Sequence, residues 1–513
     1  MRIDRKSFIR LAATGVAGAA VPMNSSGVRA PQLSTAGIAP KKQQGAAIRG
    51  STEAVAKFIV NTSLRDVPSG AIEQAKRCLV DGFGVILAGS TVHGTEIVRG
   101  YVKRVTDRKE ATVLGAGSFM APVSFAAFIN GASGHAMDFD DTQLSTTADR
   151  TYGLLTHPTV PALASALAIG ERMGASGAAF LEAFLIGFEV ECKIAEAIDP
   201  DHYNKGFHSS GTIGTFGSAA AAAKLLKLSE PQVKHMLAIA SSLSSGIRVN
   251  FGSMTKPLHV ARASENGVVA AELAAAGFTG GDDGLDGPWG FFQVFGGGAD
   301  LDRIVGVLGK PHAIVDPGVS IKPYPCGVLS HPSMDAMLKV VTEHDLKPEQ
   351  IQAVRLRAGS NILNPLRYKT AKTELEAKFC LPFLLGSIAI RRQAGVREFT
   401  DEFVSSEPVQ RMMTRVTTIF DAAIEARGFD KIRSVVEIDV TDGRRFVQAS
   451  DDRYRGGPDR PFTRDELRAK FTDCAQLTLD AGRIPQVVAA IEAVETLTDI
   501  RQLSRLMAVP APA

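Results

Sequence analysis

From Ser51 to about Asp316, apolar residues recur at spacings of three and four positions, with few alternating runs. This period is that of amphipathic helices, so the pattern predicts a mainly helical region. Helices are expected over residues 71–88, 158–172 and 178–197. Alanine and glycine recur throughout the region, which indicates helices packed at close approach in a large bundle.

The pattern changes between about residues 319 and 452. Short alternating apolar segments at 353–357 and 435–440 predict strands. The dipeptide Asp442-Gly443 follows the second segment and precedes another apolar pair, so a hairpin is expected there. Helical stretches are expected between the strands, at residues 333–341, 373–392 and 408–419. This mixture indicates a smaller α+β domain.

The fold class predicted from these patterns is mainly α with an α+β lid. The helical domain is expected at residues 51–318 and the lid at 319–452. After Pro461 helix returns, with Thr463 and Glu466 in a capping-box pattern, so residues 453–513 are expected to rejoin the helical domain. A chain of 513 residues exceeds the size at which one core keeps growing, which also favours two domains.

The N-terminal 30 residues differ from the rest. Four basic residues precede an apolar, small-residue stretch at 11–22, and Val28-Arg29-Ala30 resembles a cleavage site. The run from Arg5 to Arg10 resembles a twin-arginine export signal with lysine in place of the second arginine. Residues 1–30 are therefore predicted to be a signal peptide of a periplasmic protein, and residues 31–50 a flexible linker. A basic tail on a cytoplasmic enzyme is the alternative.

Composition and net charge limit the classes of partner that are expected. The net charge is only +3, and no basic and aromatic residues interleave, so a nucleic-acid partner is not expected. The apolar stretch at 11–22 is too short to span a membrane, so no membrane span is expected in the mature protein. The five cysteines are scattered and form no C-x-x-C pair, which predicts buried thiols. Cys326 stands out, because it lies in a turn-like Pro-Cys-Gly segment.

The densest polar cluster lies in an otherwise apolar region and includes His135, Asp138, Asp140 and Asp141, followed by Thr142. Three neighbouring carboxylates repel one another unless cations, donors or protonation relieve them. On a helix, His135 and Asp138 would share a face. A solvated acidic turn and a magnesium site both remain open at this point.

Two histidines and two lysines add candidate chemistry. His157 and His208 could donate or accept protons near neutral pH, or could cap a helix. Lys256 is expected just before a helix at residues 259–273, where a carboxylate would be stabilised by the helix N-terminus; a capping turn is the alternative. Lys322, with Tyr324 and His331 behind it, opens the second domain, and such junctions commonly line a cleft.

A glycine series invites comparison with nucleotide-binding loops. Gly211, Gly214 and Gly217 are spaced three and three, and no apolar strand precedes them. The context of the dinucleotide-binding fingerprint is therefore missing. Close packing of helices is the better interpretation of these glycines.

Taken together, these segments resemble the MmgE/PrpD family from about Ser51 to the end of the chain. The resemblance rests on NGASGHAMDFDDT (130–142), THPTVPALASALAIGE (156–171), FHSSGTIGTFGSAAAAAKLLKL (207–228), MTKPLHVARASENGVVAAELAAAGFTG (254–280), IKPYPCGVLSHPSMDA (321–336) and EAKFCLPF (376–383). It implies a large helical domain with a smaller α+β lid, a homodimer, and a site between the two domains. It also implies that no metal, nucleotide or other cofactor is needed.

The resemblance assigns roles to the candidate residues. Those implied to be catalytic are Asp138, His157, His208 and Lys256. Those predicted to bind substrate are Thr142, Lys322, Tyr324 and His331; the first three match family positions, and His331 is included for its place at the domain junction. In the resulting hypothesis, lysine and histidine hold the substrate carboxylates while His157, oriented by Asp138, moves a proton at carbon.

The function implied is that of a cofactor-independent lyase acting on a small di- or tricarboxylic acid, in the first place a hydro-lyase similar to 2-methylcitrate dehydratase. An epimerase, isomerase or decarboxylase of a related acid is the alternative, and a protein that binds a carboxylate without transforming it is a further one. One position departs from the decarboxylase members, which carry a lid histidine where this chain has Gly327; His331 lies four residues further on.

Overall fold

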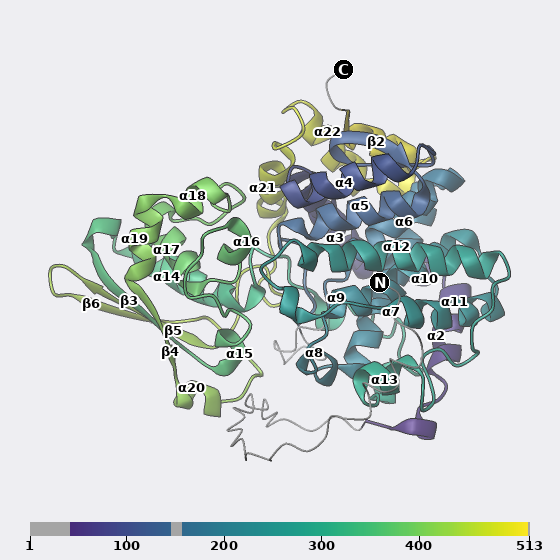
Figure 1. Ribbon diagram of the computed structural model, residues 1–513, viewed down its shortest axis with the longest axis horizontal. Coiled ribbons are helices and arrows are strands. Elements are labelled where there is room, and N and C mark those ends of the chain that lie inside the picture. The colour runs from purple at the N-terminus through teal and green to yellow at the C-terminus, as the bar shows by residue number, and fades with distance from the viewer. Residues whose placement is uncertain (1–41, 145–155, 511–513) are drawn as a thin grey trace, which may run out of the picture. The chain divides into compact units, whose positions relative to one another are not determined.

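The computed structural model of the chain describes residues 42–144 and 156–510. The predicted signal peptide at 1–30 and most of the predicted linker lie outside the described residues. Within the described residues no helix is both long enough and apolar enough to cross a bilayer. Two hydrophobic cores divide the described chain into a helical lobe and an α+β lobe (Figure 1).

The helical lobe is a bundle around α10, as the small-residue pattern predicts. Its helices are α2 (Ser51–Asn61), α3 (Ser69–Gly89), α4 (His93–Val105), α5 (Val123–Ala136), α6 (Thr159–Met173), α7 (Gly177–Ile198), α8 (Asp201–Asn204), α9 (Ser209–Thr212), α10 (Gly214–Leu226), α11 (Glu230–Leu243), α12 (Thr255–Ala275) and α13 (Phe291–Gly296). Helix α10 packs against α6, α7, α11 and α12, and α12 packs against α5.

Small residues allow these helices to approach closely. A Cβ atom added at Gly217 on α10 would lie 3.2 Å from the carbonyl oxygen of Gly187 on α7 and 2.9 Å from the Cβ atom of Glu191. One added at Gly214 would lie 2.9 Å from Pro161. The interpretation of the glycine series as packing positions is therefore confirmed, because side chains at these positions would push the helices apart.

The α+β lobe contains a four-stranded sheet in the order β4-β3-β5-β6. Its strands are β3 (Ile351–Ala358), β4 (Val416–Phe420), β5 (Ser434–Val440) and β6 (Arg445–Ala449), and only the β3–β4 pair is parallel. Its helices are α14 (His331–Glu343), α15 (Ser360–Leu363), α16 (Glu374–Ala377), α17 (Leu381–Arg391), α18 (Asp401–Ser405), α19 (Glu407–Thr414) and α20 (Ala422–Ala426). The predicted fold class, mainly α with an α+β lid, is confirmed.

Local predictions for this lobe hold in part. The hairpin at Asp442-Gly443 is confirmed, since β5 and β6 pair in antiparallel register around it. The helix predicted over residues 408–419 is wrong in its second half, where β4 runs parallel to β3. The run Val416-Thr417-Thr418-Ile419 is β-branched throughout, and such residues favour strands. The helix predicted over residues 373–392 is interrupted between α16 and α17.

The C-terminal segment packs into the helical lobe. It forms α21 (Arg464–Ala475), α22 (Arg483–Glu492), α23 (Arg501–Met507) and β7 (Ala508–Pro510). Strand β7 completes a small sheet with β1 (Ala111–Val113) and β2 (Gly115–Ala121). Lys470 on α21 pairs with Asp81 on α3 and donates to the Phe139 carbonyl at 2.9 Å. The capping box of Thr463 and Glu466 starts α21 as expected.

The end of the predicted linker differs from the expectation. Gln43 exchanges backbone hydrogen bonds with Ala299, and the Lys42 ammonium donates to the Ile198 carbonyl at 2.7 Å. Ile48 is buried in the helical core. Residues 42–50 are thus held on the helical lobe, because apolar burial and paired backbone groups outweigh their glycine and lysine content.

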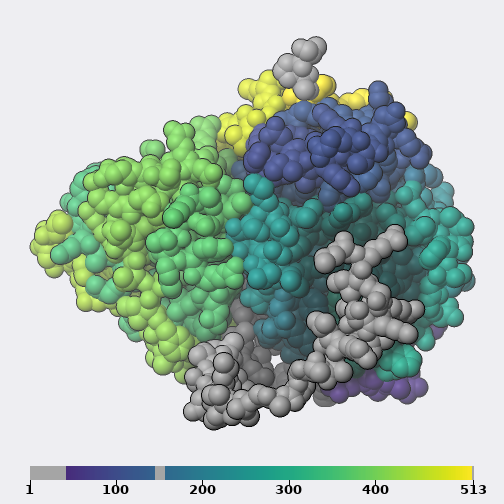
Figure 2. All heavy atoms as spheres, viewed as in Figure 1, coloured from purple at the N-terminus to yellow at the C-terminus, as the bar shows by residue number. Residues whose placement is uncertain are grey.

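The two lobes meet beside residues 249–251 of the helical lobe. Arg367 donates to the Val249 and Phe251 carbonyls, and the Tyr368 hydroxyl donates to the Phe251 carbonyl at 3.2 Å. The Phe251 ring stacks on Phe379 of the α+β lobe with centroids 5.6 Å apart. Figure 2 shows the green surface of the α+β lobe directly against the surface of the helical lobe.

Close approach of α3 and α5 yields a stability prediction. An alanine at Gly89 would drive its Cβ atom into the Ser133 carbonyl on α5, so Gly89→Ala is expected to destabilise the protein by about 1–3 kcal/mol in urea unfolding. Gly70 begins the same helix with no heavy atom within 4 Å of an added Cβ atom. Gly70→Ala is the matched control and should stabilise by about 0.5–1 kcal/mol. Equal effects of the two variants would contradict the packing argument.

Candidate active site

The acidic cluster lies just after α5, and it is not helical. Helix α5 ends at Ala136, and Asp138 has φ of 51°, in the left-handed region. The expectation that His135 and Asp138 share a helical face is therefore wrong. A left-handed aspartate is strained, and such strain persists where surrounding contacts fix it.

Two lysines fix the Asp138 carboxylate. Lys256 Nζ donates to Oδ1 at 3.0 Å, and Lys322 Nζ donates to the same oxygen at 2.7 Å and to the Asp138 carbonyl at 2.9 Å. All three side chains are buried. Burial opposes ionisation of Asp138, but the two lysines outweigh it and hold its pKa well below the usual range. The other oxygen, Oδ2, is buried without a partner among the described residues.

Lys256 differs slightly from its predicted position. Helix α12 begins at Thr255, four residues before the predicted start, so Lys256 lies within its first turn and not before it. Burial, and then the neighbouring Lys322, lower the pKa of Lys256, while Asp138 partly restores it. Lys322 lies where the chain enters the α+β lobe. The Asp138 carboxylate is thus bound by one lysine from α12 and by another from the connection between the lobes.

A second carboxylate, that of Asp140, is linked to Lys256 through His135. His135 Nδ1 lies 2.8 Å from Asp140 Oδ2, and His135 Nε2 lies 2.6 Å from Lys256 Nζ. Because Nε2 accepts from the ammonium, Nδ1 carries the ring proton and donates it to Asp140. Burial opposes ionisation of Asp140, but His135 and His157 outweigh it and keep its pKa low. His135 and Asp140 therefore orient the lysine.

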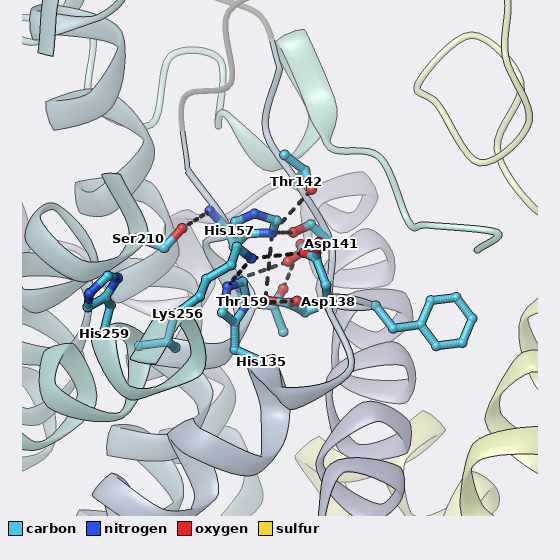
Figure 3. Close-up of polar contacts among 12 residues, drawn as sticks. His135, Asp138, Asp141, Thr142, His157, Thr159, Ser210, Lys256 and His259 are labelled. Atoms are coloured by element: carbon cyan, nitrogen blue, oxygen red, sulfur yellow. Dashed lines mark hydrogen bonds and ion pairs between the residues drawn. The ribbon is translucent and has the colours of Figure 1, made fainter. Parts of the chain in front are cut away.

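His157 is oriented by a backbone carbonyl. Its Nδ1 donates to the Asp141 carbonyl at 2.7 Å and lies 3.2 Å from the Thr142 hydroxyl (Figure 3). Asp138, the residue predicted to orient it, is instead occupied by the lysines. With Nδ1 protonated, Nε2 keeps its lone pair. Burial, and then Lys322 and His135, hold the pKa of His157 well below its usual range, although Asp140 opposes this.

His208 completes the group of imidazoles. Its Nε2 is buried without a partner among the described residues, and its Nδ1 lies 3.0 Å from Nδ1 of His259. The His208 ring centroid lies 5.5 Å from that of His135 and 6.4 Å from that of His157. Burial and the Lys256 charge hold the pKa of His208 well below its usual range. The imidazoles are therefore neutral at neutral pH, and the lysines carry the positive charge.

Thr142 and His157, two of the predicted site residues, are next in sequence to Gln143 and Thr156, which hydrogen bonds hold in place. The Gln143 amide N–H donates to the Thr156 carbonyl at 2.9 Å. The Gln143 side chain donates to Glu196 at 2.7 Å, and the Thr156 hydroxyl donates to Glu191. Both glutamates belong to α7. Helix α7 therefore places the chain on both sides of residues 145–155, which lie outside the described residues.

A cavity of about 50 Å³ joins these groups, which is room for a few water molecules. It brings together six of the eight predicted site residues. Its lining consists of Asp138, Thr142, Thr156, His157, Tyr203, His208, Ser209, Ser210, Phe251, Lys256, Lys322, Gly327, Val328, Leu329, Pro365, Leu366 and Phe379. A six-carbon acid does not fit this volume, so binding one requires the lining side chains or the lobes to move.

Tyr324 and His331, which were predicted to bind substrate, do not line this cavity. The Tyr324 hydroxyl donates to Asp335 on α14 at 2.7 Å, and the ring lines a different hollow beside Arg455. His331 is fully buried, with Nε2 3.3 Å from the Cys326 carbonyl. The sequence places both residues near the domain junction, but α14 turns them into the core of the α+β lobe.

Cys326 and Gly327 are neighbours in the sequence but lie in different surroundings. Cys326 is buried beside Ser330, and burial raises the pKa of its thiol to about 12, which excludes a reactive thiolate there. Gly327 does line the cavity. A Cβ atom at this position would lie 2.8 Å from Leu366 Cδ2, so a larger residue here would require the end of the Leu366 side chain to shift.

A divalent cation does not fit these donors. Nitrogen atoms of His135, His157 and His208 lie within 4.8 Å of one another, yet both nitrogens of His135 are engaged by Asp140 and Lys256. The Asp138 carboxylate is taken by lysines. The magnesium interpretation of the acidic cluster therefore loses its ligands to protein cations. The solvated-turn interpretation is wrong as well, since the cluster is buried.

Several contributors to the site were not among the predicted residues. His259 hydrogen-bonds the predicted residue His208, and Phe251 places its ring 5.3 Å from the Lys256 ammonium. Asp140 hydrogen-bonds His135, which in turn contacts Lys256. Ser210 accepts from the His157 amide at 2.9 Å. Their sequence signal was proximity to predicted residues: Ser210 lies two positions after His208, and His259 lies three after Lys256.

Comparisons with known proteins cover both lobes. A family model described as the MmgE/PrpD N-terminal domain matches residues 53–304, and one described as the MmgE/PrpD C-terminal domain matches residues 324–493. Cis-aconitate decarboxylase of Mus musculus is 29% identical over 488 residues, covering 90% of this chain and 94% of the mouse protein. That of Homo sapiens is 28% identical over 476 residues, covering 91% and 96%. That of Aspergillus terreus is 24% identical over 487 residues, covering 90% and 96%.

The two kinds of buried aspartate give a prediction on pH. Asp138→Asn is expected to cost about 3–5 kcal/mol at neutral pH, because two buried lysines lose their counter-ion. Folding lowers the pKa of Asp138, so the stability from its charge is present above the ordinary value of 3.8 and is lost as pH falls. The stability gap to wild type in urea unfolding should therefore narrow as the pH is lowered toward about 3.

Asp141→Asn is the matched control. Burial raises the pKa of Asp141 to about 8, so this carboxyl group is protonated at neutral pH and bonds Thr159 as a neutral group. The stability that the neutral Asp141 carboxyl group contributes is fully present below its ordinary pKa of 3.8 and is lost as the pH rises through about 8. Near pH 6, Asp141→Asn should therefore change the free energy of unfolding by less than about 1 kcal/mol. Losses of equal size in both variants would contradict the charge assignment.

Proposed function

Because the chain belongs to the MmgE/PrpD family, we propose that it is a cofactor-independent lyase that decarboxylates a small unsaturated tricarboxylic acid of the cis-aconitate type. The observation that carries the proposal is the buried pair of lysines beside neutral imidazoles in a cavity at the junction of the lobes. The similar proteins named as cis-aconitate decarboxylases favour loss of CO₂ over loss of water.

The charges at the site suit an anionic substrate. Lys256 and Lys322 share one carboxylate oxygen of Asp138 in the closed site, so a second anion can bind the same two ammonium groups without new desolvation of the lysines. Prearranged cations in a site from which water is excluded stabilise developing negative charge strongly. Both lysines therefore serve binding and the reaction.

The chemistry of decarboxylation uses this arrangement. In cis-aconitate one carboxylate sits on a CH₂ group next to a carbon–carbon double bond. When the bond to this carboxylate breaks, CO₂ leaves and its electron pair spreads over the allylic system toward the remaining carboxylates. The two lysines stabilise that charge, and a proton must then add to carbon. Each CO₂ released therefore consumes one proton.

Two imidazoles are placed for the proton steps. The Nε2 atom of His157 keeps a lone pair because its Nδ1 is fixed on the Asp141 carbonyl, so His157 suits a base or an acceptor. The Nε2 atom of His208 faces the cavity without a protein partner and suits the acid that protonates carbon. Thr142, beside His157, can hydrogen-bond a substrate carboxylate.

A hydro-lyase of the 2-methylcitrate dehydratase type is the second candidate, and Gly327 favours it. This position lines the cavity without a side chain, so no donor from it can reach the substrate. Elimination of water needs a base for the C–H proton and an acid for the leaving hydroxyl group, and His157 and His208 could fill these roles. The two candidates differ in their product and in net proton uptake.

The proposal is tested with purified protein, cis-aconitate and 2-methylcitrate, in deuterated water followed by NMR. The expected result is release of CO₂ from cis-aconitate with one solvent deuteron on carbon. Lys256→Met should lower kcat/KM by about 10²–10³-fold, because a charge aimed at the transition state is lost. His157→Gln should lower kcat by about 10²-fold or more.

The exposed Lys109 provides the control for charge, and Lys109→Met should keep wild-type kinetics. Water elimination from 2-methylcitrate without decarboxylation would favour the second candidate. Saturable binding of both acids with no chemical change would contradict a catalytic role. Wild-type rates in both Lys256→Met and His157→Gln would overturn the assignment of the site.

A further inference from the structure

His259 makes a direct contact with the cavity histidine. It lies on α12 one helical turn after Lys256, and its Nδ1 is 3.0 Å from Nδ1 of His208. The two ring centroids are 5.2 Å apart. His259 does not line the cavity, so it can act on the cavity only through His208.

The outer edge of the His259 ring points away from the closed site. The side chain keeps 8% of its surface exposed, while His208 keeps 3%. Among the described residues His259 Nε2 has no hydrogen-bond partner, yet it is not one of the sealed polar atoms, unlike Nε2 of His208. This atom therefore has contact with solvent.

Two glycines make room for the ring. A Cβ atom at Gly211 would lie 2.8 Å from His259 Cβ, and one at Gly246 would lie 3.1 Å from His259 Cγ. Gly246 has φ of 135°, a conformation that only glycine adopts readily, and its carbonyl accepts from the His208 amide at 3.0 Å. The same turn thus holds the backbone of one histidine and packs against the ring of the other.

An Nδ1···Nδ1 contact contains one proton. If His259 donates, His208 has a bare Nδ1 and its proton is on Nε2, facing the cavity. If His208 donates, its Nε2 is bare and the outer Nε2 of His259 carries the proton. The pair therefore has two neutral states. In one the outer proton is on Nε2 of His208, and in the other it is on Nε2 of His259.

We propose that His259 is a positioning residue that relays a proton from solvent to His208, and through it to the substrate carbon during decarboxylation. This inference rests on the proposed function, because decarboxylation consumes one proton per turnover whereas dehydration consumes none. The relay supplies that proton while the lobes remain closed.

The transfer balances without a charged intermediate. His208 Nε2–H gives its proton to the carbon that holds the electron pair left by CO₂. The Nδ1 proton of His259 moves to Nδ1 of His208, and a proton from solvent adds to Nε2 of His259. Both rings end neutral with their tautomers exchanged. They return when the site opens and water reaches His208, by the reverse shift.

Electrostatics explains why a relay is needed. Burial, Lys256 and His135 hold the pKa of His208 well below its usual range, so it does not store an extra proton as imidazolium. Giving up its only N–H proton would leave an imidazolate anion, which is costlier still. The groups that act on His259 are His208, His135 and Lys256, and burial with the latter two lowers its pKa to about 4.

Substitution by glutamine separates proton transfer from hydrogen bonding alone. Glutamine can hydrogen-bond His208 but cannot accept one proton while passing on another. His259→Gln is expected to lower kcat for decarboxylation by about 10–100-fold, with KM changed less than about threefold. His93 is exposed on α4, and His93→Gln is the matched control that should keep wild-type kinetics. An unchanged kcat in His259→Gln would overturn the relay.

Chemical rescue gives the second readout. His259→Ala removes the ring and leaves a space next to solvent, so added imidazoles should restore kcat of the cis-aconitate reaction in proportion to their concentration. The rescue rate should depend on the pKa of the added imidazole, because it transfers a proton. Rescue that is independent of that pKa would indicate filling of space, and it would overturn the relay.

Nitrogen-15 NMR of histidine-labelled full-length protein decides the relay independently of turnover. The chain has 10 histidines, so variants can assign the signals. The relay expects the His208 Nε2 signal to average between protonated and bare shifts in wild type and to be fixed in His259→Gln. A single fixed His208 tautomer in wild type would overturn the relay even if decarboxylation is found. Averaging in a protein without decarboxylase activity would refute the proposed function and the transfer to the substrate carbon, while proton exchange between His208 and His259 would stand.

Discussion

The Asp138 carboxylate, buried between Lys256 and Lys322, is the constraint on which the rest of the site depends. An unpaired charge at this depth would cost several kcal/mol, so each of the three groups requires the others. The requirement explains the left-handed backbone at Asp138, which turns the carboxylate from the end of α5 toward the lysines. It also ties the first turn of α12 to the connection that leads into the α+β lobe.

The same ion cluster sets the protonation of its neighbours. Buried ammonium groups oppose further positive charge, so His135, His157 and His208 stay neutral and differ only in their tautomers. Hydrogen bonds select the tautomer of two of them, through Asp140 for His135 and through the Asp141 carbonyl for His157. His208 alone is left with two neutral alternatives, because its partner is another imidazole. Charge and acid–base function are thus divided between lysines and histidines.

The sequence predicted the bundle, the lid and most of the cavity, because these follow from periodicity and from residue types that are costly to bury. It could not predict which way a side chain faces where tertiary contacts decide. Tyr324 lies two residues after Lys322, yet its hydroxyl group donates to Asp335, and only Lys322 reaches the site. The left-handed backbone at Asp138 also has no signal in the local sequence, because the two lysines that hold its carboxylate come from distant parts of the chain.

The anchored residues Gln143 and Thr156 have a consequence for how the site keeps its geometry. Both side chains hydrogen-bond glutamates of α7, and a backbone hydrogen bond joins the two residues. Thr142 and His157 are their direct neighbours in the sequence, so one helix supports both of these site residues. A shift of α7 would therefore move Thr142 and His157 together and preserve the 3.2 Å between the threonine hydroxyl and the imidazole Nδ1.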